Sequence, residues 1–298
     1  MKRRVFKDAA LQQNFIKTGY NTVNLLQPEQ VQYILNAMQD LHPSDEFLPS
    51  GEETDDLMDR VTYHCSFLDT NTEYKRQVHN LVREVFDQYV EKFLAGYRIV
   101  NANFYVKPPH QGKFAIHQNW PILDDLTDTS VTIWCPLQDT CVENGTLHVV
   151  KGSHKVYPHI EGVTLPSYFK GFEQALHDRW LTPLDVLAGD AVIFDDGLIH
   201  WTAFNHSDAP RIALQILCVP VDKQPVFFYH DPKNNPDELE LFQADVDFFI
   251  DNHISDLLVR KSDWESLGFV KNTNRLITEE EFADLMTRGD EIRAELYD

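Results

Sequence analysis

A series of short β-prone segments between residues 97 and 230, separated by turn signals, is the feature that most constrains this fold. Segments 97–106 (YRIVNANFYV), 130–137 (SVTIWCPL) and 211–221 (RIALQILCVPV) are rich in β-branched and aromatic residues, which favour strands. Turn-forming pairs such as Asn144–Gly145 lie between such segments. They do not alternate regularly with helical segments, which disfavours a parallel nucleotide-binding sheet. We therefore predict an antiparallel sandwich or jelly roll.

Helical patterns flank this β-rich region. Apolar residues recur with a 3.6-residue period after Pro28 and again between about 72 and 95. Thr70 and Glu73 stand at the spacing of a capping box, which predicts the start of the second helix. The acidic tail, about 236–298, is expected to be mostly helical.

We expect one domain, because the chain contains no linker, internal repeat or low-complexity segment. In this interpretation residues 1–298 form a mainly β fold with flanking helices. A helical N-terminal region, residues 1–96, packs on a β core of residues 97–230, and residues 231–298 form an acidic, mostly helical C-terminal extension.

The composition excludes several classes of partner. The chain has 47 acidic and 26 basic residues, a formal net charge of -21, and such a surface repels nucleic acid and anionic lipid. No apolar run approaches the roughly 20 residues of a membrane helix, and the basic N-terminus is not followed by the apolar segment of a secretory signal. The cysteines Cys65, Cys135, Cys141 and Cys218 form no CxxC pair and are too sparse for a disulfide scaffold. We therefore expect a cytoplasmic protein without nucleic-acid or membrane partners.

Two histidine-containing segments carry the candidate chemistry, since motifs of serine hydrolases, phosphate-binding loops, dinucleotide folds and zinc proteases are absent from the chain. A non-haem iron centre needs two imidazoles and one carboxylate on one face of the metal. Two of these ligands can come from one strand, because side chains at i and i+2 point to the same face. Segment 113–120 (KFAIHQNW) offers His117 and Asn119 at this spacing, and a later segment offers His200 and then Arg211. The pattern His206–Ser207–Asp208 also fits, but it lies in a polar turn and is interpreted as such.

Residues just before the first of these histidines could contact a substrate. Asn103 and Tyr105 alternate with the apolar face of their predicted strand, and Lys107 follows on the same side. Core packing accounts for Tyr105 equally well, and a solvated strand end accounts for Lys107.

These segments resemble the phytanoyl-CoA dioxygenase family of iron(II)- and 2-oxoglutarate-dependent oxygenases, over roughly residues 11–220. The early stretch FIKTGYNTVNLLQPEQV resembles the family's opening Gly-Tyr strand and helix. The stretch HQNWPILDD resembles its metal strand, usually written HQDW, and TIWCPLQDTCVENGTLHVVKGSHK resembles its central block. His200 and Arg211 stand at the family's spacing.

The resemblance implies a double-stranded β-helix (a cupin-like jelly roll) and an enzyme that uses iron(II), 2-oxoglutarate and molecular oxygen. His117 and His200 would bind the metal. Arg211 and Thr202 would bind the far carboxylate of 2-oxoglutarate, with Gln118 and Trp134 lining that end of the cavity. The expected reaction is hydroxylation of a small organic substrate, with release of succinate and CO₂.

Asn119 departs from the family pattern, because a carboxylate normally occupies its position. It is either a natural, neutral metal ligand, or an engineered or inactivating replacement of Asp, or a non-ligand whose place is taken by water or by another acid such as Asp124. Asn119 has nearly the volume of Asp, so it leaves no room for a halide, and a halogenase is not expected. A non-catalytic member that binds a metal or metabolite is the alternative. Asp195 and Asp196 precede His200 and are expected either to orient it or to be solvated.

Overall fold

Two antiparallel sheets form the centre of the molecule, in a computed structural model that describes residues 3–47, 62–126 and 128–297. The larger sheet has the order β1-β7-β4-β9-β3-β2, and the smaller has the order β6-β5-β8. Their strands are β1 (Tyr20–Asn24), β2 (His64–Cys65), β3 (Tyr97–Lys107), β4 (Val131–Pro136), β5 (Leu147–Val150), β6 (Leu181–Pro183), β7 (Asp190–Asp195), β8 (His200–Thr202) and β9 (Arg211–Pro220). The prediction of a mainly β fold with flanking helices is confirmed.

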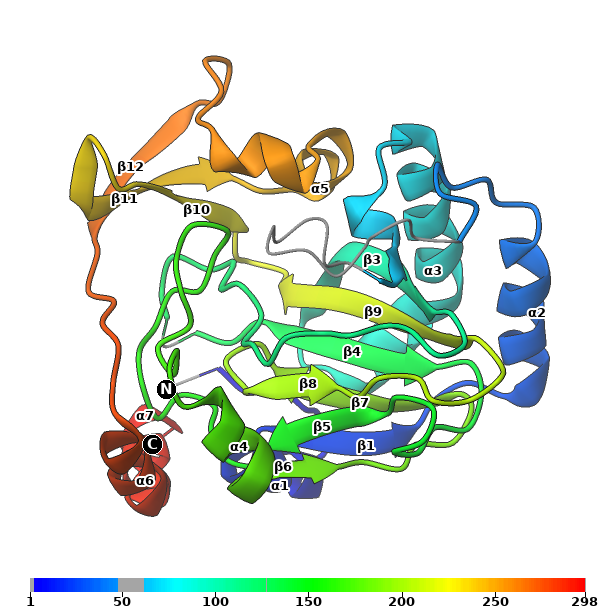
Figure 1. Ribbon diagram of the computed structural model, residues 1–298, viewed down its shortest axis with the longest axis horizontal. Coiled ribbons are helices and arrows are strands. Elements are labelled where there is room, and N and C mark those ends of the chain that lie inside the picture. Colours follow the sequence, from blue (N-terminus) through cyan, green and yellow to red (C-terminus); the bar gives the residue numbers. More distant parts are fainter. Residues whose placement is uncertain (1–2, 48–61, 127, 298) are drawn as a thin grey trace.

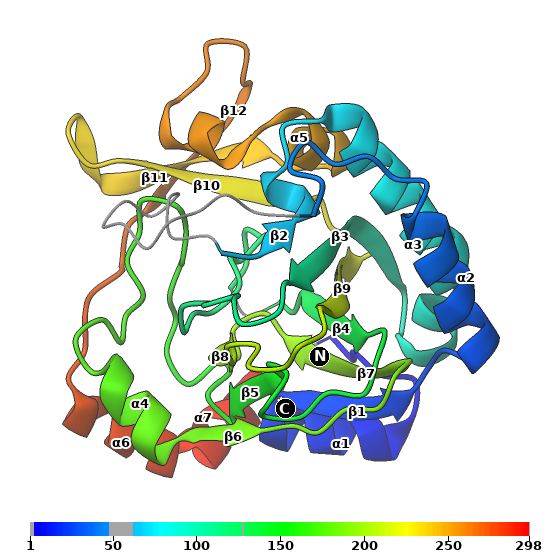
Figure 2. The same cartoon turned by 45° about the vertical axis from the view of Figure 1, so that its right-hand side comes forward.

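The larger sheet is buried on both faces, and strand β7 illustrates how. Ala191 and Ile193 pack toward the helices, whereas Val192 and Phe194 pack between the two sheets. This alternation follows from the two-residue period of a strand. Figure 2 shows helices α1 (Ala9–Thr18), α2 (Pro28–Met38) and α3 (Thr72–Phe93) along the outer side of the larger sheet. The opposite face is therefore left to line a cavity with the smaller sheet.

The expected N-terminal helices are present, with one correction at a helix start. Helix α2 begins at Pro28, and α3 covers almost all of the predicted segment. The residue that caps α3 is Asn71, whose side chain accepts from the amide of Tyr74, rather than Thr70 in a capping box. Asparagine is as good a cap as threonine, so the pattern located the start of the helix but not its capping residue. Residues 48–61 of the expected helical region lie outside the described residues.

Two strands of a third sheet lie in the C-terminal extension, so the prediction of a mostly helical extension is wrong for residues 235–243 and 266–271. Strands β10 (Val226–Asp231), β11 (Asn235–Gln243) and β12 (Ser266–Lys271) pair antiparallel at one end of the molecule (Figure 1). The helical elements of the extension are α5 (Val246–Asp251), η2 (Ile254–Leu258), α6 (Glu279–Thr287) and α7 (Gly289–Tyr297), and the chain before it also contains η1 (Ser66–Leu68) and α4 (Glu173–Arg179). In β11, residues 238–241 alternate acidic and apolar side chains. That is a strand period, which the helix-favouring acidic composition obscured.

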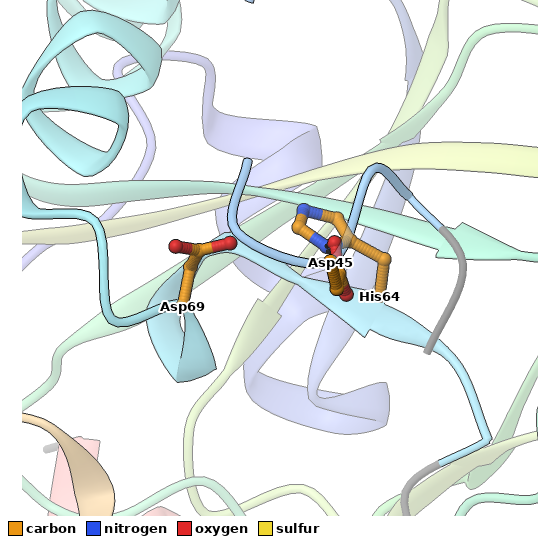
Figure 3. Close-up of side chains that lie close together, drawn as sticks. All are labelled: Asp45, His64 and Asp69. Atoms are coloured by element: carbon orange, nitrogen blue, oxygen red, sulfur yellow. Dashed lines mark hydrogen bonds and ion pairs between the residues drawn. The ribbon is translucent and has the colours of Figure 1, made fainter. Parts of the chain in front are cut away.

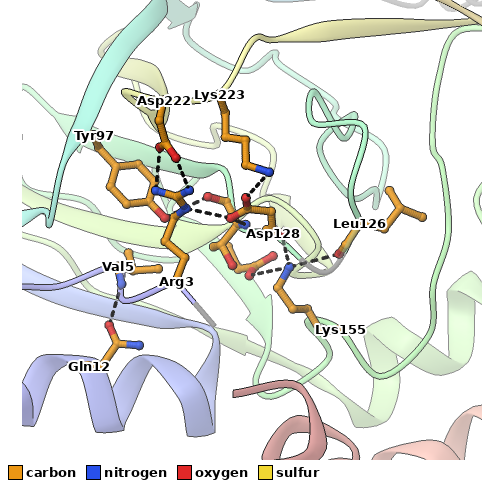
Figure 4. A network of polar contacts seen from close by, with 11 residues as sticks. Arg3, Val5, Gln12, Tyr97, Leu126, Asp128, Lys155, Asp222 and Lys223 are labelled. Atoms are coloured by element: carbon orange, nitrogen blue, oxygen red, sulfur yellow. Dashed lines mark hydrogen bonds and ion pairs between the residues drawn. The ribbon is translucent and has the colours of Figure 1, made fainter. Parts of the chain in front are cut away.

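A network of ion pairs fixes the N-terminal segment near the end of β7 (Figure 4). Asp128 accepts from Arg3 at 3.0 Å, and Lys223 lies 3.0 Å from its other carboxylate oxygen. Lys155 donates to the backbone carbonyl of Asp128 at 2.7 Å, and its ammonium lies 3.6 Å from Asp195. Segments far apart in sequence thus hold the loop before β4 against the last residue of β7.

No helix among the described residues has the length and apolar character needed to cross a bilayer. The division of the chain into a single domain with three regions stays a prediction.

Candidate metal centre

His117 and His200 face each other across an isolated antiparallel bridge. The segment KFAIH is therefore not a regular strand; it pairs only where the amide of each histidine donates to the carbonyl of the other, at 3.1 and 2.9 Å. Side chains of directly paired residues point to the same side, which brings the two rings to a centroid distance of 4.2 Å. One backbone pairing thus brings together two histidines that are far apart in sequence.

The protonation state of both rings suits metal binding. Each Nδ1 lies 2.9 Å from the carbonyl oxygen two residues earlier, that of Ala115 or Leu198. A carbonyl only accepts, so Nδ1 carries the proton and Nε2 keeps its lone pair. Burial lowers the pKa of His117 to about 4 and the pKa of His200 well below its usual value. Neutral imidazoles with a free Nε2 are what a divalent metal requires.

Asn119 is held in one orientation by two oxygen acceptors. Its Nδ2 donates to Thr132 Oγ1 at 2.8 Å and to Asp196 Oδ1 at 2.9 Å. The Thr132 hydroxyl donates to the same Asp196 oxygen at 2.6 Å, so it can only accept from the amide. The amide nitrogen therefore faces Asp196, and the amide oxygen is turned away from it. Asn119 lines the same pocket as His117 and His200.

Asp196 is the buried acid of this site, and its sequence-based role needs correction. His200 is oriented by the hydrogen bond between its Nδ1 and the Leu198 carbonyl, whereas Asp196 accepts a hydrogen bond from the amide of Asn119. Burial raises the pKa of Asp196 to about 6. Asp124, the acid considered as a substitute ligand, is exposed and does not line this pocket. Two adjacent acids at the end of the apolar run AVIF, in DAVIFDD, are the sequence signal for a buried carboxylate here.

Arg211 is a buried cation whose donors lack partners. Its side chain is 1% exposed, and among the described residues Nε and Nη1 have no hydrogen-bond partner. The guanidinium carbon lies 5.7 Å from the ring centroid of Trp134, and burial lowers the pKa of Arg211 to about 9. Unpaired buried charge is costly, so this position suits an anion. A carboxylate can satisfy two guanidinium donors at once.

These groups share one pocket of about 40 Å³ between the two sheets. Arg211, Thr202 and Trp134 line it together with His117 and His200. Arg211 comes from the larger sheet and Thr202 from the smaller, so the two are brought together by the sandwich and not by a shared hairpin. A small dicarboxylic keto acid fits this donor set, with one end at the guanidinium and the other near the imidazoles.

The remaining predicted residues divide into two groups. Asn103, Tyr105 and Gln118 line a second pocket that adjoins His117; Gln118 is absent from the lining of the Arg211 pocket, where it was expected. Lys107 lines neither pocket. Its ammonium donates to the carbonyls of Thr202 and Ala203, so it supports the end of β8 rather than facing a substrate.

A second histidine–carboxylate cluster lies elsewhere (Figure 3). Asp45, His64 and Asp69 offer ligand atoms within 4.8 Å of one another, the one such group of His, Cys, Asp or Glu among the described residues. Protein partners already account for it: His64 Nδ1 lies 2.8 Å from Asp45 and Nε2 lies 2.8 Å from the Tyr74 hydroxyl. Asp69 accepts from two backbone amides. We assign this group, hereafter the His64 cluster, a structural role.

Comparisons with known proteins match this picture. The family model described as phytanoyl-CoA dioxygenase (PhyH) matches residues 17–213. Phytanoyl-CoA dioxygenase domain-containing protein 1 of Mus musculus is 27% identical over 126 residues, 40% of this chain and 43% of the relative. Its Dictyostelium discoideum homolog is 26% identical over 147 residues, 47% of this chain and 50% of the relative. The matched stretch therefore spans about half the length of these relatives or less.

Two solved structures resemble the chain in fold. One is a non-heme alpha ketoglutarate dependent carbocyclase, SnoK, with a TM-score of 0.53 and 17% identity, over 73% of this chain and 86% of that one. The other is the epimerase SnoN, also alpha ketoglutarate dependent, with a TM-score of 0.51 and 20% identity, over 73% and 84%. Both come from nogalamycin biosynthesis. At this identity the likeness shows the fold alone, and it confirms the predicted double-stranded β-helix.

Proposed function

The chain belongs to the phytanoyl-CoA dioxygenase family, and from this membership we propose that it is an iron(II)- and 2-oxoglutarate-dependent oxygenase. We propose further that it hydroxylates a small organic substrate. His117 and His200 hold the metal, Asn119 completes the facial set through its amide oxygen, and Arg211 with Thr202 holds the far carboxylate of 2-oxoglutarate.

The unpaired donors of Arg211 carry this proposal. A buried guanidinium with two unpaired nitrogen donors, Nε and Nη1, destabilises a fold unless an anion joins it. Here it lies in one pocket with a pair of neutral imidazoles. An anion site and a metal site in one small cavity match a co-substrate that binds both.

The residues of the chain position the reactants and exclude water. Iron(II) held by His117, His200 and Asn119, together with 2-oxoglutarate held by Arg211 and Thr202, would supply the oxidising chemistry, in which one atom of molecular oxygen would enter a substrate C–H bond and the other would enter succinate with loss of CO₂. The carbonyls of Ala115 and Leu198 fix both histidine tautomers. Phe114 and Phe194 each lie 4.8 Å from one histidine ring, measured between ring centroids, and form part of the pocket wall. Asp196, through Asn119, places negative charge near a metal that a neutral amide alone would leave more positive.

The test is formation of succinate from 2-oxoglutarate by purified protein with iron(II) and oxygen. Arg211→Ala is expected to abolish it, because the carboxylate loses its only buried cationic partner in the pocket lining that the structure describes. Exposed Arg83→Ala is the matched control. Equal turnover by Arg211→Ala and the parent chain would count against the proposal.

A non-catalytic metal- or metabolite-binding protein is the second candidate. The observation that favours it is the amide at position 119, since a neutral oxygen binds iron(II) less firmly than a carboxylate. Calorimetry with manganese(II) and the succinate assay together separate the two candidates. Binding of metal without succinate formation supports a sensor or structural module.

A further inference from the structure

The pocket that adjoins His117 has a volume of about 200 Å³ and is lined by several aromatic rings. Tyr63 and Tyr105 are stacked, with centroids 6.0 Å apart and planes 22° apart. Phe114 lies 4.8 Å from Tyr63, and Trp120 lies 6.0 Å from Phe67. Such walls favour flat rings, which gain offset or edge-to-face contacts beyond the burial of area.

Three of the polar groups that line this pocket are neutral amides on two neighbouring strands, those of Asn101, Asn103 and Gln215. A bulge between Ile99 and Asn101 changes which face of β3 each residue occupies. Ile99 packs toward the helices, whereas Asn101 and Asn103 line the pocket. Gln215 of β9 stands opposite Asn103 in the register, and their amides lie 3.3 Å apart. The nitrogen of such an amide can donate to a hydroxyl or carbonyl oxygen, and its oxygen can accept from a hydroxyl.

No Lys, Arg, Asp or Glu lines this pocket among the residues that the structure describes. An ionised ligand would lose part of its hydration there without gaining an opposite charge. A neutral ligand with one or two hydrogen-bonding groups meets no such penalty.

Part of the wall comes from the C-terminal extension. Phe249 of α5 and Ile254 of η2 line the pocket, and both lie beyond residues 17–213 of the family match. Helix α5 is tied to α3 by Arg76, which donates to Asp247 at 2.8 Å. Lys75 of α3 also donates to the carbonyl of Asn252 at 3.1 Å. The shape of this wall is therefore set by elements outside the matched region.

We propose that this pocket selects an uncharged, flat ring compound bearing a hydroxyl or carbonyl group as the substrate. The proposal rests on the oxygenase function proposed above. The amides of Asn103 and Gln215 hold the polar group, the aromatic wall holds the ring, and Phe249 limits its size.

The test is calorimetry of the full chain, without metal or 2-oxoglutarate, against four probes. These are 2-naphthol, its anionic match 2-naphthoate, its cationic match 2-naphthylmethylammonium, and the chain alcohol 1-decanol. We expect 2-naphthol to bind at least about tenfold more tightly than each of the others. Tighter binding of 2-naphthoate or 1-decanol, or binding of none of the four, would overturn the proposal; the decanol result would indicate an acyl chain instead.

Two variants sharpen this test. Asn103→Asp is expected to weaken 2-naphthol and to favour the cationic probe, whereas Asn36→Asp, on the exposed side of α2, changes neither. Phe249→Ala is expected to weaken 2-naphthol about tenfold. An unchanged preference in a folded Asn103→Asp protein contradicts the proposal, and if that variant does not fold, the four-probe comparison on the parent chain decides. Succinate formation from 2-oxoglutarate depends on the Arg211 pocket, so succinate without 2-naphthol binding refutes the substrate class alone.

Discussion

The His64 cluster and the His117 site contain similar side chains, but they differ in whether those side chains have hydrogen-bond partners within the protein. In the His64 cluster both ring nitrogens and the neighbouring carboxylates have protein partners. In the His117 site the carbonyl-bound Nδ1 leaves Nε2 for a ligand, and Arg211 keeps two buried donors unpaired. A search for ligand-type atoms that lie close together finds the His64 cluster. A search for buried polar groups without hydrogen-bond partners finds Arg211 of the His117 site.

The energetic consequence is that the two regions should respond differently to mutation. A satisfied buried network stabilises the fold, and its loss leaves groups without partners. An unsatisfied site costs stability until its ligand binds. Four predictions test this contrast, from the largest expected effect to the smallest.

Arg211→Met should weaken 2-oxoglutarate binding more than about 100-fold, because two charge-assisted hydrogen bonds are lost. Without 2-oxoglutarate, the free energy of unfolding of the same variant should be about 1 kcal/mol higher than that of the parent chain, since an unpaired buried cation is removed. Calorimetry with manganese(II) and urea unfolding measure the two effects.

Lys107→Met is the matched control, because Lys107 and Arg211 are partners in the register of β3 and β9. Lys107 donates to two carbonyls, so its loss should lower the free energy of unfolding by about 2 kcal/mol. If both variants lose stability equally, Arg211 is not an unsatisfied group.

His64→Ala should mainly lower the stability of the fold, whereas His117→Ala should mainly weaken metal binding. His64→Ala leaves Asp45 and the Tyr74 hydroxyl without partners and should lower the free energy of unfolding by about 3 kcal/mol. His117→Ala should cost about 1 kcal/mol or less but weaken manganese(II) binding at least about 100-fold. Urea unfolding and manganese(II) titration give both numbers, and loss of metal binding in His64→Ala would reverse our assignment of the two clusters.

Restoring the carboxylate at position 119 should succeed only as a double variant. The amide nitrogen of Asn119 now lies 2.9 Å from Asp196. Asn119→Asp alone puts a carboxylate oxygen in its place, and two like charges at that distance repel. Asn119→Asp with Asp196→Asn moves the charge onto the ligand and restores the donor. We expect the double variant to bind manganese(II) about 10- to 100-fold more tightly than the parent chain.

The single variant is the control for this exchange. It should gain less than the double variant and should lose thermal stability in the absence of metal. Equal metal affinity of the single and double variants would show that Asp196 does not act through position 119.

Glu161 is a buried acid that has hydrogen-bond partners and yet a raised pKa. We therefore expect it to make the stability of the fold depend on pH. Burial raises the pKa of Glu161 to about 7, although it accepts from Ser167 and from the amide of Gln118. The folded state therefore binds this proton more firmly than the unfolded state, so stability falls as the pH rises from about 4.5 to 7. Glu161→Gln should be about 1–2 kcal/mol more stable than the parent chain at pH 8 and nearly equal at pH 5.

Urea unfolding at the two pH values measures this effect, with exposed Glu265→Gln as the control. A stability difference that is the same at pH 5 and pH 8 would refute the contribution of Glu161.

Local patterns predicted much of the sheet and little of how its polar groups pair. Strands β3, β4 and β9 match the β-prone segments 97–106, 130–137 and 211–221 to within one residue, because the period of two and β-branched composition act over a few residues. The acidic alternation in β11 was misinterpreted, since a composition that favours helices competed with that period. The residue that caps α3 was missed for a similar reason, because two neighbouring residues suit the role.

At the site, the sequence identified His117, His200 and Arg211 but led to wrong roles for Lys107 and Asp196. Both are polar residues near strand ends, and sequence spacing alone does not say which partner a strand end meets. The structure pairs Lys107 with carbonyls of the opposite sheet and Asp196 with Asn119.

The sequence by itself determined which strands form, which faces are apolar, and that an amide stands where a carboxylate is usual. Only the tertiary structure decided that the two histidines share a bridge, that Asp196 holds Asn119 by its nitrogen, and that Arg211 is left unpaired. The physical reason is range. Periodicity is set by neighbours along the chain, whereas the pairing of a buried polar group depends on which distant segments close around it.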